Sequence, residues 1–193
     1  KEAMLSVKHQ TYRPIEMIVV DDSPLHTAKD IVNAFIYDSD FPVTYLESGN
    51  KGSNFSRNLG IDAATGAYIA FLDDDDLFHP PKIEKQLEYL KSQNCNLLSC
   101  YYDKIYPKDL IVQYRPPKFV TFLPMVFAKV YSFIPTSTLV VETSLAKRVK
   151  FDISIKSGQD WDFVLGVIRA KGKIGFLREC HVDKREHGTE QIS

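Results

Sequence analysis

The chain has 193 residues, of which 44% are hydrophobic and 25% charged, and its formal net charge is −1. These values are typical of a folded soluble domain with a real core and exclude an intrinsically disordered chain. A charge so close to zero gives no basic field, so we expect no nucleic-acid partner. The sequence predicts neither a membrane span nor a signal peptide.

The cysteines, Cys95, Cys100 and Cys180, are odd in number and match no zinc-ligand spacing. We interpret them as reduced thiols in the core of a cytoplasmic protein.

The first half of the chain predicts strands that alternate with helices. The expected strands are the apolar or β-branched runs at residues 16–20, 42–46 and 67–72. Between them, apolar residues repeat on one helical face over 28–35, and a turn-rich loop leads into a helix over about 55–64.

Helix boundaries in this half are suggested by the residues that commonly begin helices. Ser53 or Asn54 is the expected cap of the helix over about 55–64. Pro80 and Pro81 stand where a further helix is expected to begin.

Strand–helix alternation predicts an α/β fold with a mainly parallel sheet and helices on both faces. In such sheets, ligands bind beyond the carboxyl ends of the strands. Two acidic turns are expected at such ends, Asp21-Asp22 and the run Asp73 to Asp76. The topology alone therefore predicts the place of a site.

The second half is less regular. Strands are expected over 96–106, 110–114, 136–142 and 173–177, and a helix from Gly158 to near Gly172. Neither an internal repeat nor a linker divides the chain, so we expect a single domain over residues 1–193.

The run of aspartates carries the strongest chemical signal. One aspartate before a helix is most simply a cap, but four in a row repel one another unless a cation lies among them. Carboxylate oxygens suit Mg²⁺ or Mn²⁺, which often share their shell with substrate phosphates. In extended backbone, Asp73 and Asp75 would face one ligand while Asp74 turns elsewhere.

Four stretches in order resemble one known family. They are HQTYRPIEMIVVDDSPLHTA, GNKGSNFSRNLGIDAATGAYIAFLDDDDLFHPPKIEKQL, SGQDWDFVLGVIRAKGKIGFL and KREHGTEQIS. Together they resemble glycosyltransferase family 2, whose members have the nucleotide-sugar-binding GT-A fold. The resemblance implies a nucleotide-binding half over 1–94 and an acceptor and catalytic half over 95–193. Members usually begin with a strand that this sequence lacks, so the first strand of the sheet is expected to be missing.

The resemblance also implies residues for the donor nucleotide. Asp22, with Asp21 nearby, would contact the nucleotide base, and Arg57 would lie near the nucleotide pocket. Asp73 and Asp74 would approach the ribose.

The reacting end of the donor is implied by other positions. Asp75 would bind Mn²⁺ or Mg²⁺, and Asp160 would be the general base, although Gln159 stands where the family often has glutamate. Arg185 and His187 could close over the diphosphate, with His187 as a second metal ligand.

The implied function is metal-dependent transfer of a sugar, with inversion, from a nucleotide diphosphate donor such as a UDP-sugar. The acceptor would be a saccharide or a lipid-linked hydroxyl in glycan or polysaccharide synthesis. Such acceptors are handled at the inner face of a membrane, which implies a cytoplasmic protein in peripheral contact with it.

Other classes share parts of this pattern. A receiver domain also has an acidic turn after its first strand and binds Mg²⁺, but the interval from Asp22 to Asp73 is long for that fold. A sugar nucleotidyltransferase would need a glycine-rich basic loop after its first strand. A catalytically silent sugar-binding homologue would keep the fold without turnover.

Overall fold

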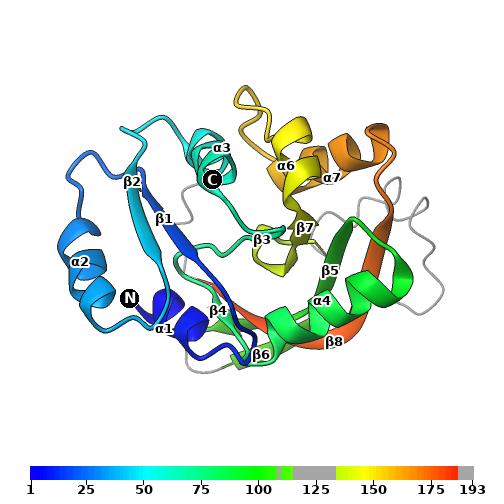
Figure 1. Ribbon diagram of the computed structural model, residues 1–193, viewed down its shortest axis with the longest axis horizontal. Helices are drawn as coiled ribbons and strands as arrows, with labels where there is room; N and C mark the ends of the chain where they lie inside the picture. Colours follow the sequence, from blue (N-terminus) through cyan, green and yellow to red (C-terminus); the bar gives the residue numbers. More distant parts are fainter. Residues whose placement is uncertain (108–109, 115–133, 187–193) are drawn as a thin grey trace.

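The computed structural model describes residues 1–107, 110–114 and 134–186 (Figure 1). The first half forms α1 (Glu2–Lys8), β1 (Met17–Asp21), α2 (Lys29–Tyr37), β2 (Val43–Glu47), α3 (Ser53–Ala63), β3 (Tyr68–Ala70), β4 (Leu77–Phe78) and α4 (Lys82–Gln93). The second half forms β5 (Leu97–Tyr106), β6 (Leu110–Tyr114), the 3-10 helix η2 (Thr136–Thr138), β7 (Val140–Glu142), α6 (Thr143–Val149), α7 (Gln159–Arg169) and β8 (Ile174–Arg185).

The strands form two sheets. Strands β1 and β2 pair in parallel, and the second sheet has the order β3-β7-β5-β8-β4, with β6 paired to β5. The predicted α/β class and the helices on both faces are confirmed, whereas the larger sheet is mixed. Its β5–β8 pair is parallel and its other pairs are antiparallel. Within the described residues, β1 pairs only with β2 and β3 only with β7.

Both faces of the larger sheet are buried. Successive residues of a strand point to opposite faces, so neighbouring residues belong to different apolar clusters. Leu97 and Val141 pack in a cluster with Phe163 and Val164 of α7. Their neighbours Leu98 and Val140 pack instead in a cluster with Leu87 and Leu90 of α4. The helices α6 and α7 therefore cover one face and α4 the other (Figure 1).

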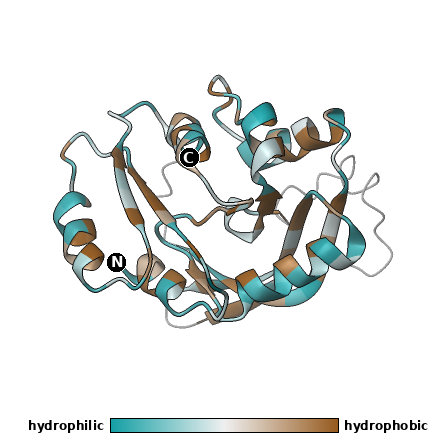
Figure 2. Ribbon diagram, in the orientation of Figure 1, coloured by the Kyte–Doolittle hydropathy of each residue, from teal (hydrophilic) through white to brown (hydrophobic). Residues whose placement is uncertain are grey.

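The smaller sheet has its own apolar cluster, built from Met17 of β1, Phe35 of α2 and Phe41. Helix α3 lies between the two sheets and contacts both β1 and α6 (Figure 1). Figure 2 shows the hydrophobic residues running along β1 and the central strands while outer helix faces are hydrophilic. From this position, α3 can contact both acidic turns, Asp21-Asp22 and Asp73 to Asp76.

Two local predictions were wrong, and one helix was not predicted. Residues 136–142 are not one strand, because Thr136–Thr138 form a 3-10 turn in which the Thr138 hydroxyl donates to the Pro135 carbonyl at 2.7 Å. Helix α3 begins at Ser53 itself after Gly52, so neither Ser53 nor Asn54 is its cap. The short helix α6, between β7 and the turn at Lys150, had no predicted counterpart.

Within the residues that the structure describes, none of the helices combines the length and apolar character that crossing a membrane requires.

Candidate active site

At the end of β1, Asp21 organises the segment that follows it. Its Oδ1 accepts a hydrogen bond from the Ser23 amide at 2.9 Å, and its Oδ2 accepts from the Ala28 amide at 3.1 Å and the Tyr45 hydroxyl at 2.9 Å. Burial raises the pKa of Asp21, but these donors together outweigh it, so the pKa lies below its ordinary value. Asp21 is therefore an ionised, buried anchor of the loop.

The next residue, Asp22, holds the loop between β2 and α3. Its two oxygens accept from the amides of Lys51 and Gly52, both at 2.8 Å, and from the Ser48 hydroxyl at 2.7 Å. Gly52 has φ 92°, a conformation that glycine adopts at little cost. Burial raises the pKa of Asp22, but these hydrogen bonds lower it by more, so the pKa lies below its ordinary value.

Helix α3 connects the two acidic turns. Ser56 lies 2.8 Å from the Ser48 hydroxyl, beside Asp22. The next residue, Arg57, donates through Nη2 to Asp73 Oδ1 at 2.9 Å and through Nη1 to Gln159 Oε1 at 2.8 Å. One guanidinium group thus joins α3, the turn formed by Asp73 to Asp76, hereafter the acidic turn, and the first turn of α7.

The aspartate run is a β-turn and not extended backbone, since the Asp76 amide donates to the Asp73 carbonyl at 3.2 Å. The expected alternation still appears in the exposure of the side chains. Asp73 and Asp75 are half-buried and Asp74 is exposed. Asp76 turns inward and is fully buried.

Asp76 is bound from two sides. The Ser137 hydroxyl donates to Oδ2 at 2.6 Å and the Arg185 amide to Oδ1 at 3.2 Å. Burial raises the pKa of Asp76 to about 6, and the charges of Asp73 and Asp75 add to this rise, whereas Ser137 and the charge of Lys184 oppose it. Asp76 is therefore the structural residue of the turn and faces away from solvent.

Asp160 lies in the first turn of α7, which begins after Gly158, a residue with φ 74°. The Thr136 hydroxyl donates to Asp160 Oδ1. Burial raises the pKa of Asp160, as does the nearby charge of Asp73, while Thr136, Arg57 and Lys184 lower it. A half-buried carboxylate with a raised pKa has the properties of a general base.

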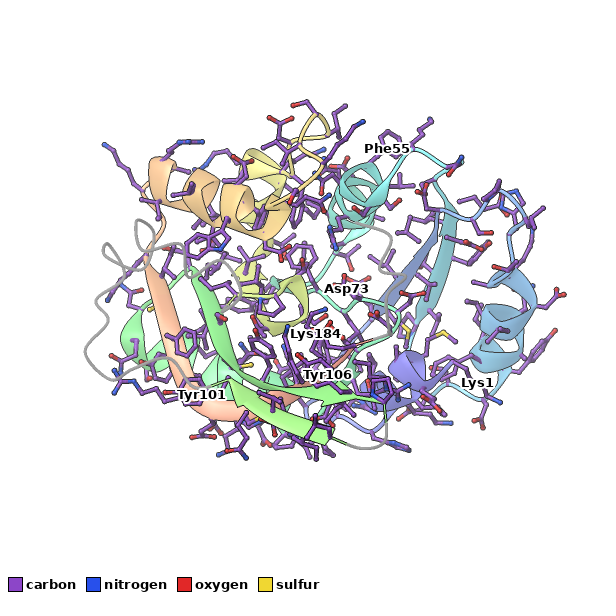
Figure 3. The ribbon with its side chains drawn as sticks, turned by 180° about the vertical axis from the view of Figure 1, so that it is seen from behind. Lys1, Phe55, Asp73, Tyr101, Tyr106 and Lys184 are labelled. Atoms are coloured by element: carbon purple, nitrogen blue, oxygen red, sulfur yellow. The ribbon has the colours of Figure 1, made fainter. Side chains whose placement is uncertain are left out.

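Strand β8 contributes a cation at its carboxyl end. Lys184 acts on both Asp76 and Asp160 through its charge, and Figure 3 shows it below Asp73 in the middle of the molecule. The next side chain, Arg185, points to α1, where it forms an ion pair with Glu2. His187, the expected second metal ligand, lies outside the described residues.

The aspartates can be compared with what a divalent ion requires. Among the described residues, no group of three or more His, Cys, Asp or Glu side chains is arranged to hold a metal ion. Asp76 is buried and Asp73 is paired with Arg57, and Asp75, the position that the family resemblance implies for the ion, is half-buried in the same turn. Mg²⁺ is commonly bound by one or two carboxylates together with substrate phosphates, so the donor set fits an ion that arrives with a diphosphate.

Several residues at this site had no part in the sequence predictions. Thr136 and Ser137 lie in a segment expected to be a strand, although three hydroxyl residues after a proline are also typical of a turn. Gln159 was noted as a departure, but its bond to Arg57 could not be foreseen. Lys184 carried no signal of its own.

Comparison with known proteins agrees with this geometry. The model of glycosyl transferase family 2 matches residues 1–151, and the chain therefore belongs to this family. A relative from Rickettsia felis, described as an uncharacterized glycosyltransferase, is 32% identical over 90% of this chain and 28% of its own length. One from Methanocaldococcus jannaschii, described in the same words, is 26% identical over 93% of this chain and 63% of its own length. The chain thus spans less than two thirds of these relatives.

Among solved structures, S. aureus TarS 1-349 in complex with UDP-GlcNAc has a TM-score of 0.77 at 20% identity, over 98% of this chain and 55% of that chain. This likeness shows that the two share a fold. A Bacillus subtilis relative named for teichuronic acid biosynthesis, TuaG, is 38% identical over 49% of this chain and 38% of its own length.

Proposed function

We propose that the chain is a metal-dependent inverting glycosyltransferase that moves a sugar from a nucleotide diphosphate to an acceptor hydroxyl. The observation that carries the proposal is the guanidinium of Arg57, which links the acidic turn at Asp73 to the helix that presents Asp160. One cation thereby joins the candidate metal-binding turn to the helix that carries the candidate base. Family membership supports the same reaction class.

The donor would lie across the acidic turn with its nucleoside toward Asp21 and Asp22. Among the described residues, Arg57 and Lys184 are cations near the turn and would attract the diphosphate. Mg²⁺ or Mn²⁺ held by Asp75 would neutralise the charge that develops on the leaving diphosphate. UDP-GlcNAc is the first donor to test, because TarS, which shares the fold, binds it.

The acceptor hydroxyl would approach Asp160, which takes its proton as the new glycosidic bond forms. The hydroxyl oxygen would attack the anomeric carbon on the side away from the diphosphate while the bond to the diphosphate breaks, so this single displacement would invert the anomeric configuration. The relative named for teichuronic acid biosynthesis supports a saccharide product, and we propose a saccharide or lipid-linked acceptor at the cytoplasmic face of a membrane.

Product analysis with Asp160→Asn tests the assignment. We expect the wild type to release UDP from UDP-GlcNAc, and the variant to bind UDP unchanged but to release it about 10²–10⁴-fold more slowly. The amide is nearly isosteric and cannot accept the proton, so the loss would fall on turnover and not on binding. Release of pyrophosphate from UTP and a sugar 1-phosphate, without release of UDP from UDP-GlcNAc, would indicate a nucleotidyltransferase. Normal turnover by the variant would remove Asp160 from the role of base.

A further inference from the structure

Helix η2 carries three consecutive hydroxyl residues that are almost completely buried, Thr136, Ser137 and Thr138. Each one bonds to a different part of the molecule. Thr136 donates to Asp160 of α7, and Ser137 donates to Asp76 and accepts from the Asp73 amide at 3.0 Å. The third, Thr138, bonds to Ser99 of β5 at 2.8 Å.

We propose that Thr136 is a positioning residue for the transfer reaction, holding the Asp160 carboxylate so that Oδ2 takes the proton of the acceptor hydroxyl. The proposal rests on the proposed role of Asp160 as the base. Thr136 occupies Oδ1, and in the described part of the chain Oδ2 has no hydrogen-bond partner. The free oxygen is therefore the one that can face an acceptor.

The Thr136 hydroxyl is held in place by its neighbours. Thr138 is fixed to β5 and to the Pro135 carbonyl, and Ser137 is fixed to the acidic turn. A hydrogen-bond donor whose position is already fixed by rigid elements loses little conformational freedom when the reaction begins. Helix η2 therefore fixes the positions of the turn at Asp73 to Asp76 and of the base, Asp160, relative to each other.

Charged groups around Asp160 come from several elements. Arg57 of α3 and Lys184 of β8 favour its ionised form, and Asp73 of the acidic turn opposes it. On its own helix, Asp162 and Arg169 lie 3.9 Å apart and face each other. Thr136 is the neutral donor in this set, so its removal changes a hydrogen bond without changing the charges.

Thr136→Val tests the proposal because valine has the shape of threonine without the hydroxyl. Thr136→Ser keeps the hydroxyl and is the conservative variant. Thr143→Val is the matched control, since Thr143 also loses a buried hydroxyl bond, to the Gly66 carbonyl at 2.6 Å, away from Asp160. The pKa of Asp160 is measured from the pH titration of its carboxyl ¹³C resonance, which is assigned by comparison with Asp160→Asn. The midpoint of the acidic limb of kcat is measured from the rate of UDP release with UDP-GlcNAc at different pH values.

We expect Thr136→Val to raise the pKa of Asp160 and the midpoint of the acidic limb of kcat by about one to two pH units, since a hydrogen bond to the ionised form is lost. Thr136→Ser and Thr143→Val should leave both near the wild-type values, and the KM for UDP-GlcNAc should change less than kcat. A Thr136→Val protein with the wild-type carboxyl titration and acidic limb would overturn the proposal. So would equal shifts in Thr136→Val and Thr143→Val.

Should Thr136→Val not fold, the wild type still decides. Its Thr136 methyl resonance must titrate with the same midpoint as the Asp160 carboxyl carbon and stay constant with pH in Asp160→Asn. A Thr136 resonance that ignores this titration would contradict the proposal. If the wild type releases no UDP from any nucleotide sugar, the proposed function fails and this inference fails with it. If the wild type releases UDP but Thr136→Val shifts neither the pKa of Asp160 nor the acidic limb of kcat, only the role of Thr136 is contradicted.

Discussion

Asp76 shows how one residue of the acidic turn can be structural while its neighbours remain available to a ligand. It is fully buried, bonded to Ser137 and to the backbone of Arg185, and its pKa is raised to about 6 by burial and by the charges of Asp73 and Asp75. In the folded state its protonated form is therefore favoured below about pH 6. In the unfolded chain the carboxyl has its ordinary pKa near 3.8.

This difference predicts a pH dependence. Between these two pKa values the folded protein binds a proton that the unfolded chain has lost, so the contribution of Asp76 to stability decreases as pH rises from about 4 to above 6. A shift of about two pH units corresponds to about 3 kcal/mol. We expect the free energy of unfolding of Asp76→Asn to gain about this much relative to the wild type between about pH 4 and about pH 7.

Urea unfolding at several pH values measures this difference. Asp74→Asn is the control, since Asp74 belongs to the same turn but is exposed. A difference between Asp76→Asn and the wild type that stays constant over this pH range would contradict the burial argument.

At the scale of elements, the packing of α7 on α6 leaves little room. A methyl group at Gly166 of α7 would lie 2.5 Å from Val149 Cγ1 of α6. Gly60 of α3 is also helical, but there a methyl group would lie 3.5 Å from Val20 Cγ2, an ordinary contact. Two glycines in equivalent backbone conformations therefore differ in their surroundings.

We expect Gly166→Ala to destabilise the protein by about 1–3 kcal/mol, because overpacking outweighs the better helix propensity of alanine. Gly60→Ala should be neutral or stabilising by up to about 1 kcal/mol. Adding Val149→Ala to Gly166→Ala should recover part of the loss. Thermal unfolding of the four proteins measures this, and equal effects of the two glycine substitutions would show that the α6–α7 contact is looser than described.

The elements that repeat apolar residues at regular spacing could be predicted from the sequence. Strands β1 and β2 and helices α2 and α4 were found because one face of each is buried by residues close in sequence. Helix η2 was missed because its role is set by partners far away in the chain, such as Asp76, 61 residues from Ser137. Hydroxyl residues next to an apolar run do not reveal such partners.

At the scale of the whole molecule, α3 and η2 bring together residues that are far apart in sequence. Asp76 and the Arg185 amide are 109 residues apart, and Arg57 and Gln159 are 102 apart. Topology predicted that each acidic turn follows a strand, and Asp21 ends β1 while Asp73 comes shortly after β3. It could not predict that Lys184 would face them while Arg185 turns to Glu2, because this depends on the alternation of side chains along β8.

The account as a whole claims that the acidic turn binds a nucleoside diphosphate together with a divalent ion. Calorimetric titration of UDP into the protein, with and without Mn²⁺, tests this most directly. We expect binding that requires Mn²⁺ and is weakened at least about tenfold in Asp75→Asn, the loss of one charged ligand being worth more than about 1.4 kcal/mol. Asp62→Asn is the control, because Asp62 pairs with Lys150 on the surface. UDP that binds equally well without Mn²⁺ and to Asp75→Asn, or that does not bind at all, would contradict the account.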